Sequence, residues 1–143
     1  MKPLPHRYEV RICGGPGSQA TAHGAGLPDL PTAPPVEFDG PGDVWSPEQL
    51  LLAAVGACFV LTFRAVARAS RIEFTTIGVG VEGVVDRTNG SARFTEIVLR
   101  PRVALPAGVD TARVRWVLEK AQRGCLVSAS LALPVRLEPE LEG

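Results

Sequence analysis

Residues 46–63 read SPEQLLLAAVGACFVLTF, and this stretch decides how the 143-residue chain folds. Ser46 is a good helix N-cap, and Pro47 suits the first helical position because its missing N–H needs no partner there. Gln49 completes an S-x-x-Q capping box, in which two side chains satisfy free backbone groups reciprocally. The stretch therefore predicts a helix that begins here and runs to about Ser70.

The first half of this helix is strongly apolar. From Leu50 to Phe63 every residue except Gly56 and Thr62 is apolar. The run has 14 residues, whereas a helix that spans a bilayer needs about 20, so we expect no membrane segment. A helix that is apolar on all sides is buried on most of its circumference, which a small monomer cannot easily arrange, so we expect a homodimer. The second half becomes amphipathic, with an exposed stripe at Arg64, Arg68 and Arg71.

The remainder of the chain predicts strands around this helix and one further helix. Period-two alternation marks the strands, and a Thr-Asn-Gly turn signal joins the two long ones as an antiparallel hairpin. This order of elements gives an α+β fold, and nothing in the sequence divides it, so we expect one domain over residues 1–143. The predicted elements are strands at 7–13 and 19–23, a hairpin with strands at 77–85 and 97–105, a helix that is capped by Asp110 or Thr111 and ends at Gly124, and a last strand at 131–137.

Composition and charge exclude several classes of protein. Hydrophobic residues make up 45% of the chain and charged residues 21%, which excludes global disorder. Fifteen Lys and Arg balance fifteen Asp and Glu without any block of like charge, so we expect no nucleic-acid partner. The first ten residues contain no apolar run, and the three cysteines show no disulfide spacing, which favours a cytoplasmic protein.

Elimination leaves the thiols as the candidates for chemistry. The sequence contains no CxxC pair, no glycine motif for a dinucleotide or a phosphate, and only two histidines, His6 and His23. We therefore expect no metal and no cofactor, and also no serine triad, because neither histidine is placed with an acid. What remains is thiol chemistry.

The three cysteines stand in different sequence settings. Cys58 lies in the apolar helix, where a buried thiol that packs as a small hydrophobe is the competing interpretation. Cys125 follows the second helix, whose negative dipole end does not stabilise a thiolate, so it is a poor first nucleophile but could act as a resolving thiol. Cys13, at the end of the first strand, is interpreted as a bystander.

Two motifs in this chain resemble those of the OsmC/Ohr family of organic hydroperoxide reductases. The first reads SPEQL at 46–50 and continues with ACF at 57–59, and the second reads GCLVS at 124–128. The order of predicted elements also matches that family, so the resemblance covers nearly the whole chain. It implies an OsmC-like α+β fold and an intertwined homodimer, with two long cysteine-bearing helices at its centre.

The resemblance also implies roles for single residues. It makes Cys58 the peroxidatic thiolate, Cys125 the resolving thiol and Glu48 a catalytic carboxylate. The implied activity is a thiol-dependent peroxidase that reduces an organic hydroperoxide, with an external dithiol as reductant and no cofactor. We expect apolar side chains around the first cysteine, which would favour hydrophobic hydroperoxides over hydrogen peroxide. These side chains are Leu51, Leu52, Val55 and Phe59.

One position departs from the family pattern. An arginine usually follows the first strand in a GGR-type turn, where it holds the thiolate and the acid. Here the turn reads GGPG at 14–17, with Pro16 in the place of the arginine. Proline carries no charge, so peroxidase activity would be weaker or replaced by another function. The alternative is a non-enzymatic dimeric protein that binds a small hydrophobic ligand and uses the cysteines as core residues.

Overall fold

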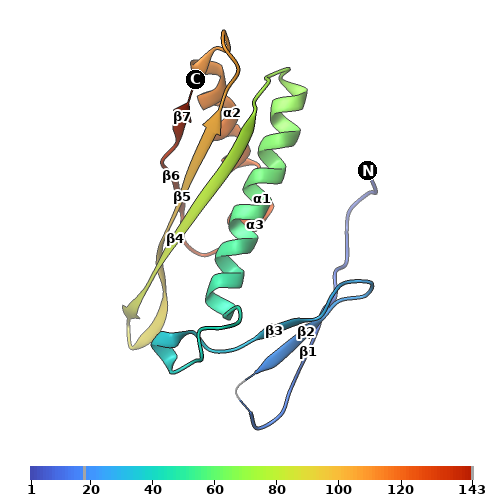
Figure 1. Ribbon diagram of the computed structural model, residues 1–143, viewed down its shortest axis with the longest axis vertical. Coiled ribbons are helices and arrows are strands. Elements are labelled where there is room, and N and C mark those ends of the chain that lie inside the picture. The colour runs from blue at the N-terminus through green and yellow to red at the C-terminus, as the bar shows by residue number, and fades with distance from the viewer. Residues whose placement is uncertain (18, 143) are drawn as a thin grey trace. The chain divides into compact units, whose positions relative to one another are not determined.

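The computed structural model describes residues 1–17 and 19–142, and the chain divides into two compact units, residues 1–50 and 51–143. The first unit contains a three-stranded antiparallel sheet in the order β1-β2-β3, followed by a short 3-10 helix. Its elements are β1 (Arg11–Gly14), β2 (Ala20–His23), β3 (Leu30–Thr32) and the 3-10 helix Val36–Phe38 (Figure 1).

The first unit corrects two expectations about its strands. The predicted strand at 7–13 begins only at Arg11, and Tyr8 before it is 88% exposed. Alternation of apolar and polar residues predicts a strand when one face of that strand is buried. Residues 7–10 are exposed on both faces, so their alternation does not lead to a strand here. The unpredicted strand β3 contains Pro31, which is tolerated because β3 is an edge strand of this sheet.

Helix α1 (Pro47–Ala69) begins where the capping box predicts and ends one residue earlier than expected. The Ser46 backbone N–H donates to Gln49 Oε1 at 3.1 Å, and the Gln49 N–H donates to Ser46 Oγ at 3.2 Å. These reciprocal bonds satisfy backbone donors that a helix leaves free at its start. By length and composition α1 is also the one described helix that could cross a membrane, a test that core helices of soluble proteins pass as well.

In the single chain, burial along α1 is confined to one side of the helix. Its completely buried side chains follow one stripe with a spacing of four residues, from Val55 through Phe59 and Phe63 to Ala67. The other side of the helix is exposed, and Leu61 there is 58% exposed. One sheet covers only one side of a helix, so burial on most of the circumference, which is expected with a partner helix in a homodimer, stays a prediction. The predicted arginine stripe at Arg64, Arg68 and Arg71 is exposed as expected, and so are Ala53, Ala54 and Ala57 on the apolar part.

The second unit is built on a long antiparallel hairpin (Figure 1). Strands β4 (Thr76–Thr88) and β5 (Ser91–Ala104) pair over their whole length, with a bulge between Val84 and Val85. Asn89 and Gly90 form the turn with φ of 51° and 84°. Positive φ at both central residues is typical of a type I′ turn, which matches the twist of the strands it joins. The predicted hairpin and its turn are confirmed.

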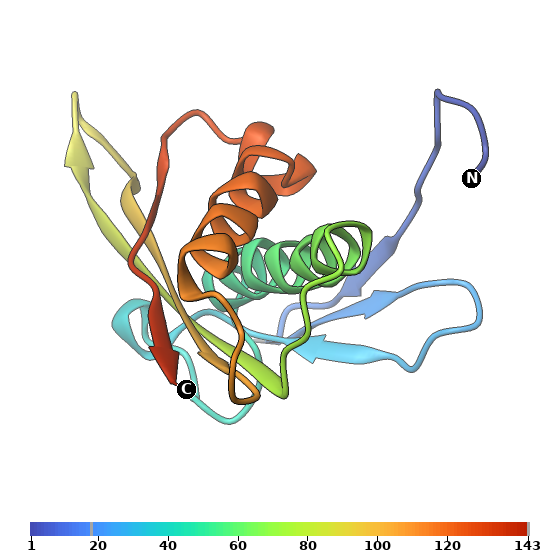
Figure 2. The ribbon, with the colours of Figure 1, turned by 90° about the horizontal axis from the view of Figure 1, so that it is seen from above.

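Helices α1 and α2 (Thr111–Arg123) lie on the same side of the β4–β5 hairpin (Figure 2). Helix α2 is capped by Asp110, whose carboxylate accepts from the Ala112 N–H at 3.0 Å. Its buried face and the buried stripe of α1 share one apolar core with the inner face of β5. The completely buried members of that core on α2 and β5 are Val114, Val117, Leu118, Ala121, Ile97, Leu99 and Val103.

The end of the chain differs most from the prediction. Instead of one strand at 131–137, it forms α3 (Leu126–Ala129), β6 (Val135–Leu137) and β7 (Glu140–Glu142). The two short strands both pair with β5 in parallel. Leu131 and Leu133 still pack on the core, which explains their alternation, but they do not pair as a strand.

Candidate active site

The structure brings two of the three cysteines together. Cys58 is half-buried on α1, and Cys125, which is completely buried, lies within hydrogen-bonding reach of its thiol. Cys13 is exposed on β1. One thiol of the pair is thus accessible to a small molecule, and the other is adjacent to it but shielded from solvent.

Helix α3 positions the groups around Cys58. Helix α2 stops at Arg123, Gly124 follows it, and Cys125 is already the N-cap of α3. The backbone of Leu126 and Val127, the first residues of α3, lies close enough to the Cys58 thiol to lower its pKa. The sequence places Cys125 at the negative end of one helix, but it does not reveal that a new helical turn starts there and presents free N–H groups.

These contacts decide the ionisation of Cys58. Burial alone opposes the charged form, but hydrogen bonds from the Val127 backbone, Cys125, Thr62 and the Leu126 backbone outweigh it, so the pKa of the Cys58 thiol is lowered. A thiolate is the nucleophilic form of cysteine, and a lowered pKa increases its population at neutral pH.

Sequence reasoning missed three of the residues that contact Cys58. Thr62 could have been found, because a residue four positions later lies on the same side of a helix. Leu126 and Val127 gave no comparable signal, because they approach through their backbones from more than sixty residues further along the chain. Their contact depends on the tertiary fold and on a helix that the sequence did not predict.

Glu48 lies in the first turn of α1, where a negative charge interacts favourably with the helix dipole. Its Oε1 is shielded from solvent and has no hydrogen-bond partner among the residues that the structure describes. Ten residues of helix separate Glu48 from Cys58, a rise of about 15 Å, which a glutamate side chain cannot span. The helix itself therefore keeps this carboxylate away from the cysteine of its own chain.

The apolar surface beside Cys58 also differs from the expected one. Val55 and Phe59 are completely buried in the core under the sheet, so they do not offer a wall to a ligand. Leu51 and Leu52 are half-buried. Leu126, whose backbone lies close to Cys58, has a side chain that is 69% exposed.

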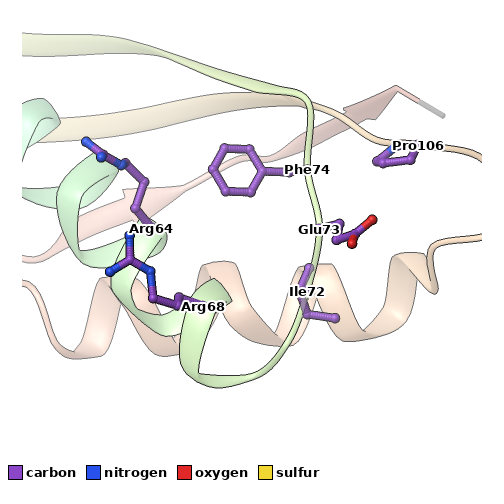
Figure 3. A pocket seen from close by; sticks show the side chains of 6 residues that line it. All are labelled: Arg64, Arg68, Ile72, Glu73, Phe74 and Pro106. Atoms are coloured by element: carbon purple, nitrogen blue, oxygen red, sulfur yellow. The ribbon is translucent and has the colours of Figure 1, made fainter.

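Two other features of the chain have the residue types of a binding or catalytic site. One is a pocket with a volume of about 350 Å³, and none of the predicted site residues lines it. Figure 3 shows that Arg64 and Arg68 project from α1 into this region, which Glu73 and Phe74 also line. The ring of His23 lies 2.8 Å from Asp29, so the expectation that neither histidine has an acid is wrong.

That pair does not make a triad. Among the described residues, no hydroxyl or thiol hydrogen-bonds to His23, so a nucleophile is missing. No described group of three His, Cys, Asp or Glu side chains is arranged to hold a metal ion.

Comparison with known proteins places this chain in a family. The sequence profile of the OsmC-like protein family matches residues 40–140. The chain belongs to the OsmC/Ohr family. An organic hydroperoxide resistance protein of Xanthomonas axonopodis pv. citri is 30% identical over 116 residues, which is 78% of this chain and 77% of that protein. The peroxiredoxin OsmC of Escherichia coli is 28% identical over 135 residues, 94% of this chain and 92% of that protein.

A solved structure supports the OsmC-like fold. The chain superposes on an OsmC-like protein of unknown function from Vibrio cholerae with a TM-score of 0.87, at 16% identity, over 94% of this chain and 99% of that one. At this identity the likeness concerns the fold alone. The OsmC/Ohr resemblance and the α+β fold predicted from the sequence are both confirmed.

Proposed function

We propose that this OsmC/Ohr protein is a cytoplasmic, cofactor-independent thiol peroxidase that reduces organic hydroperoxides. One observation carries the proposal: the half-buried Cys58 thiol has a lowered pKa and lies next to the buried thiol of Cys125. An accessible thiolate beside a second thiol is the arrangement that a two-cysteine peroxidase needs. The family's hydroperoxide-related members support the choice of substrate.

The first step uses the accessible thiol. The Cys58 thiolate attacks the hydroperoxide oxygen that is distal to carbon, the O–O bond breaks, and the alkoxide leaves and takes a proton to become an alcohol. The sulfur becomes a sulfenic acid. The side chain of Leu126, whose backbone lies close to the thiol, is apolar and exposed, which supports a substrate with an apolar carbon group over hydrogen peroxide.

The second and third steps use the buried thiol and an external reductant. The Cys125 thiol displaces the sulfenic hydroxyl of Cys58, which forms a disulfide and releases water. A small dithiol then exchanges with this disulfide, returns both cysteines to thiols and leaves as its own disulfide. The cycle needs no metal and no bound cofactor.

The proposed active form is a homodimer. The apolar side of α1 with Ala57 and Leu61 is exposed in the single chain, and a second copy would cover it. Because Glu48 cannot reach its own cysteine along the helix, its proposed role is to act on Cys58 of the partner subunit. The Oε1 atom of Glu48 is shielded from solvent and has no hydrogen-bond partner in the single chain, which is consistent with a partner group supplied by the second subunit.

Cysteine variants test this function. Cys58→Ser should abolish consumption of cumene hydroperoxide with dithiothreitol as reductant, whereas Cys125→Ser should complete a first turnover and stop at the sulfenic acid. Cys13→Ser is the matched control and should keep full activity, because Cys13 is exposed on β1. Full multiple-turnover activity of Cys58→Ser would refute the assignment. Two inert thiols in the wild-type protein would instead favour the ligand-binding alternative.

A further inference from the structure

The pocket at the end of α1 has the size of a site for a small molecule. Its volume is about 350 Å³, and pockets that hold small ligands begin at roughly 300 Å³. Two arginines project into it from α1, and because they are four residues apart they lie on the same side of the helix (Figure 3). We call it the arginine pocket, and the residues that line it are Arg64, Arg68, Ile72, Glu73, Phe74 and Pro106.

The folded chain itself forms the apolar wall of the arginine pocket, which consists of Ile72, Phe74 and Pro106. The Ile72 N–H donates to the Ala67 carbonyl at 2.9 Å, a bond across five residues that is typical of a Schellman helix end. This turn brings the chain back beside the helix, where Ile72 joins the apolar core and Phe74 packs against it. The Phe74 ring also contacts Phe63 edge to face, with ring centroids 5.0 Å apart. The wall therefore exists without a ligand.

The charged side chains of the arginine pocket differ from those of the sheet. Arg64 and Arg68 make no ion pair with any residue that the structure describes, although Glu73 lines the same pocket. Like charges one helical turn apart repel each other, and a negative group between the two guanidinium groups would remove this repulsion. In contrast, each of three arginines on the sheet pairs with two carboxylates. These pairs are Arg100 with Glu82 and Glu138, Arg102 with Glu140 and Glu142, and Arg136 with Glu96 and Glu138.

We propose that the arginine pocket binds a small organic molecule with one carboxylate and an apolar group. The planar guanidinium groups of Arg64 and Arg68 match the geometry of a carboxylate, and the apolar wall contacts the remainder of the ligand. With Glu73, the lining carries two positive charges and one negative charge. A net charge of one suits a monocarboxylate, and the nearby carboxylate of Glu73 disfavours a phosphate dianion.

This site is separate from the thiols. Arg64 follows Cys58 by six residues of α1, a rise of about 9 Å, and Arg68 lies one further turn away. The inference therefore does not depend on the peroxidase function proposed above.

The test is an NMR titration of the ¹⁵N-labelled wild-type chain with 3-phenylpropionate, which combines a carboxylate with an apolar ring. We expect saturable shifts of the backbone amides of residues 72–74, with a dissociation constant in the millimolar range or tighter. Two probes each lack one half of this chemistry: 3-phenyl-1-propanol has no carboxylate, and inorganic phosphate has no apolar group. Both should bind about tenfold more weakly or not at all.

Variants assign the binding to named side chains. Arg64→Gln with Arg68→Gln removes both charges at exposed positions and should weaken phenylpropionate binding about tenfold or more. The matched control, Arg115→Gln with Arg123→Gln, removes the same charge from the exposed side of α2 and should keep the wild-type affinity. Glu73→Gln should strengthen the binding of phosphate, because it removes the negative charge that disfavours a dianion.

Four results would overturn the proposal. The first is the absence of saturable shifts with phenylpropionate, and the second is equal binding of the alcohol, which would show an apolar cavity that does not use the arginines. Tighter binding of phosphate would show an anion site without a role for the apolar wall. Binding to the variant Leu61→Asp, which has a charge on the exposed side of α1, but not to the wild type would show that a second copy covers the pocket.

Discussion

One side of α1 packs into the core of residues 51–143, whereas the other side carries equally apolar residues that remain exposed. Phe59 is completely buried on the first side, and Leu61, two positions later, is 58% exposed on the second. Cys58 lies between them and is half-buried. The apolar residues on one side of the helix therefore form the core of the chain itself. We propose that the apolar residues on the other side bind a second copy of the chain. Cys58, the proposed nucleophile, lies where these two sides of the helix meet.

The largest effect is expected on the core side. Phe59→Ala should lower the free energy of unfolding by about 3–5 kcal/mol, because it removes a completely buried aromatic side chain and leaves a cavity. Urea unfolding followed by circular dichroism measures this loss.

Leu61→Ala is the matched control on the exposed side of the same helix. It should lower the free energy of unfolding by less than half as much as Phe59→Ala. This loss should depend on protein concentration if the leucine packs between chains. If both variants lose the same free energy of unfolding at every protein concentration, the two sides of α1 do not differ in burial as the structure indicates.

Elements that are fixed by residues close together in the sequence could be predicted, and elements that depend on distant residues could not. The start of α1 is set by Ser46 and Gln49, which bond to each other, and the hairpin turn by Asn89 and Gly90, so both could be predicted. Helix α3 depends on how the chain returns to β5, which no local pattern encodes.

The site divides in the same way. Cys58 and Cys125 could be named from their motifs, but the environment of the first depends on backbone groups of Leu126 and Val127 that the tertiary fold brings to it. The prediction that Val55 and Phe59 form an apolar wall beside Cys58 was wrong, because hydrophobicity alone does not tell which side of α1 faces the sheet. Apolar residues on the core side and on the exposed side look the same in the sequence.

The exposed side should control assembly. In dilute solution, light scattering of the wild-type protein should give about twice the chain mass of 15.1 kDa. Leu61→Asp places a charge in the proposed contact between chains, and it should shift the protein to the single-chain mass while its circular dichroism spectrum stays unchanged. A wild-type mass of one chain at micromolar concentration would contradict the proposed homodimer.

The smallest expected effect concerns Glu48. Mixing Cys58→Ser chains with Glu48→Ala chains should restore one intact site per heterodimer, built from the glutamate of the first chain and the cysteine of the second. Activity should then return to about half the wild-type value per heterodimer, since two-fold symmetry gives two equivalent sites. Native mass spectrometry confirms that heterodimers form. If they form and activity does not return, Glu48 does not act across the dimer.

The most direct test of the central claim, that Cys58 and Cys125 form one redox pair, is the intact mass of the wild-type chain after one equivalent of cumene hydroperoxide. We predict a mass lower by two hydrogen atoms and a disulfide that peptide mapping assigns to Cys58 and Cys125. The Cys125→Ser variant should instead gain one oxygen atom, at Cys58. An unchanged wild-type mass, or a disulfide that includes Cys13, would contradict the account.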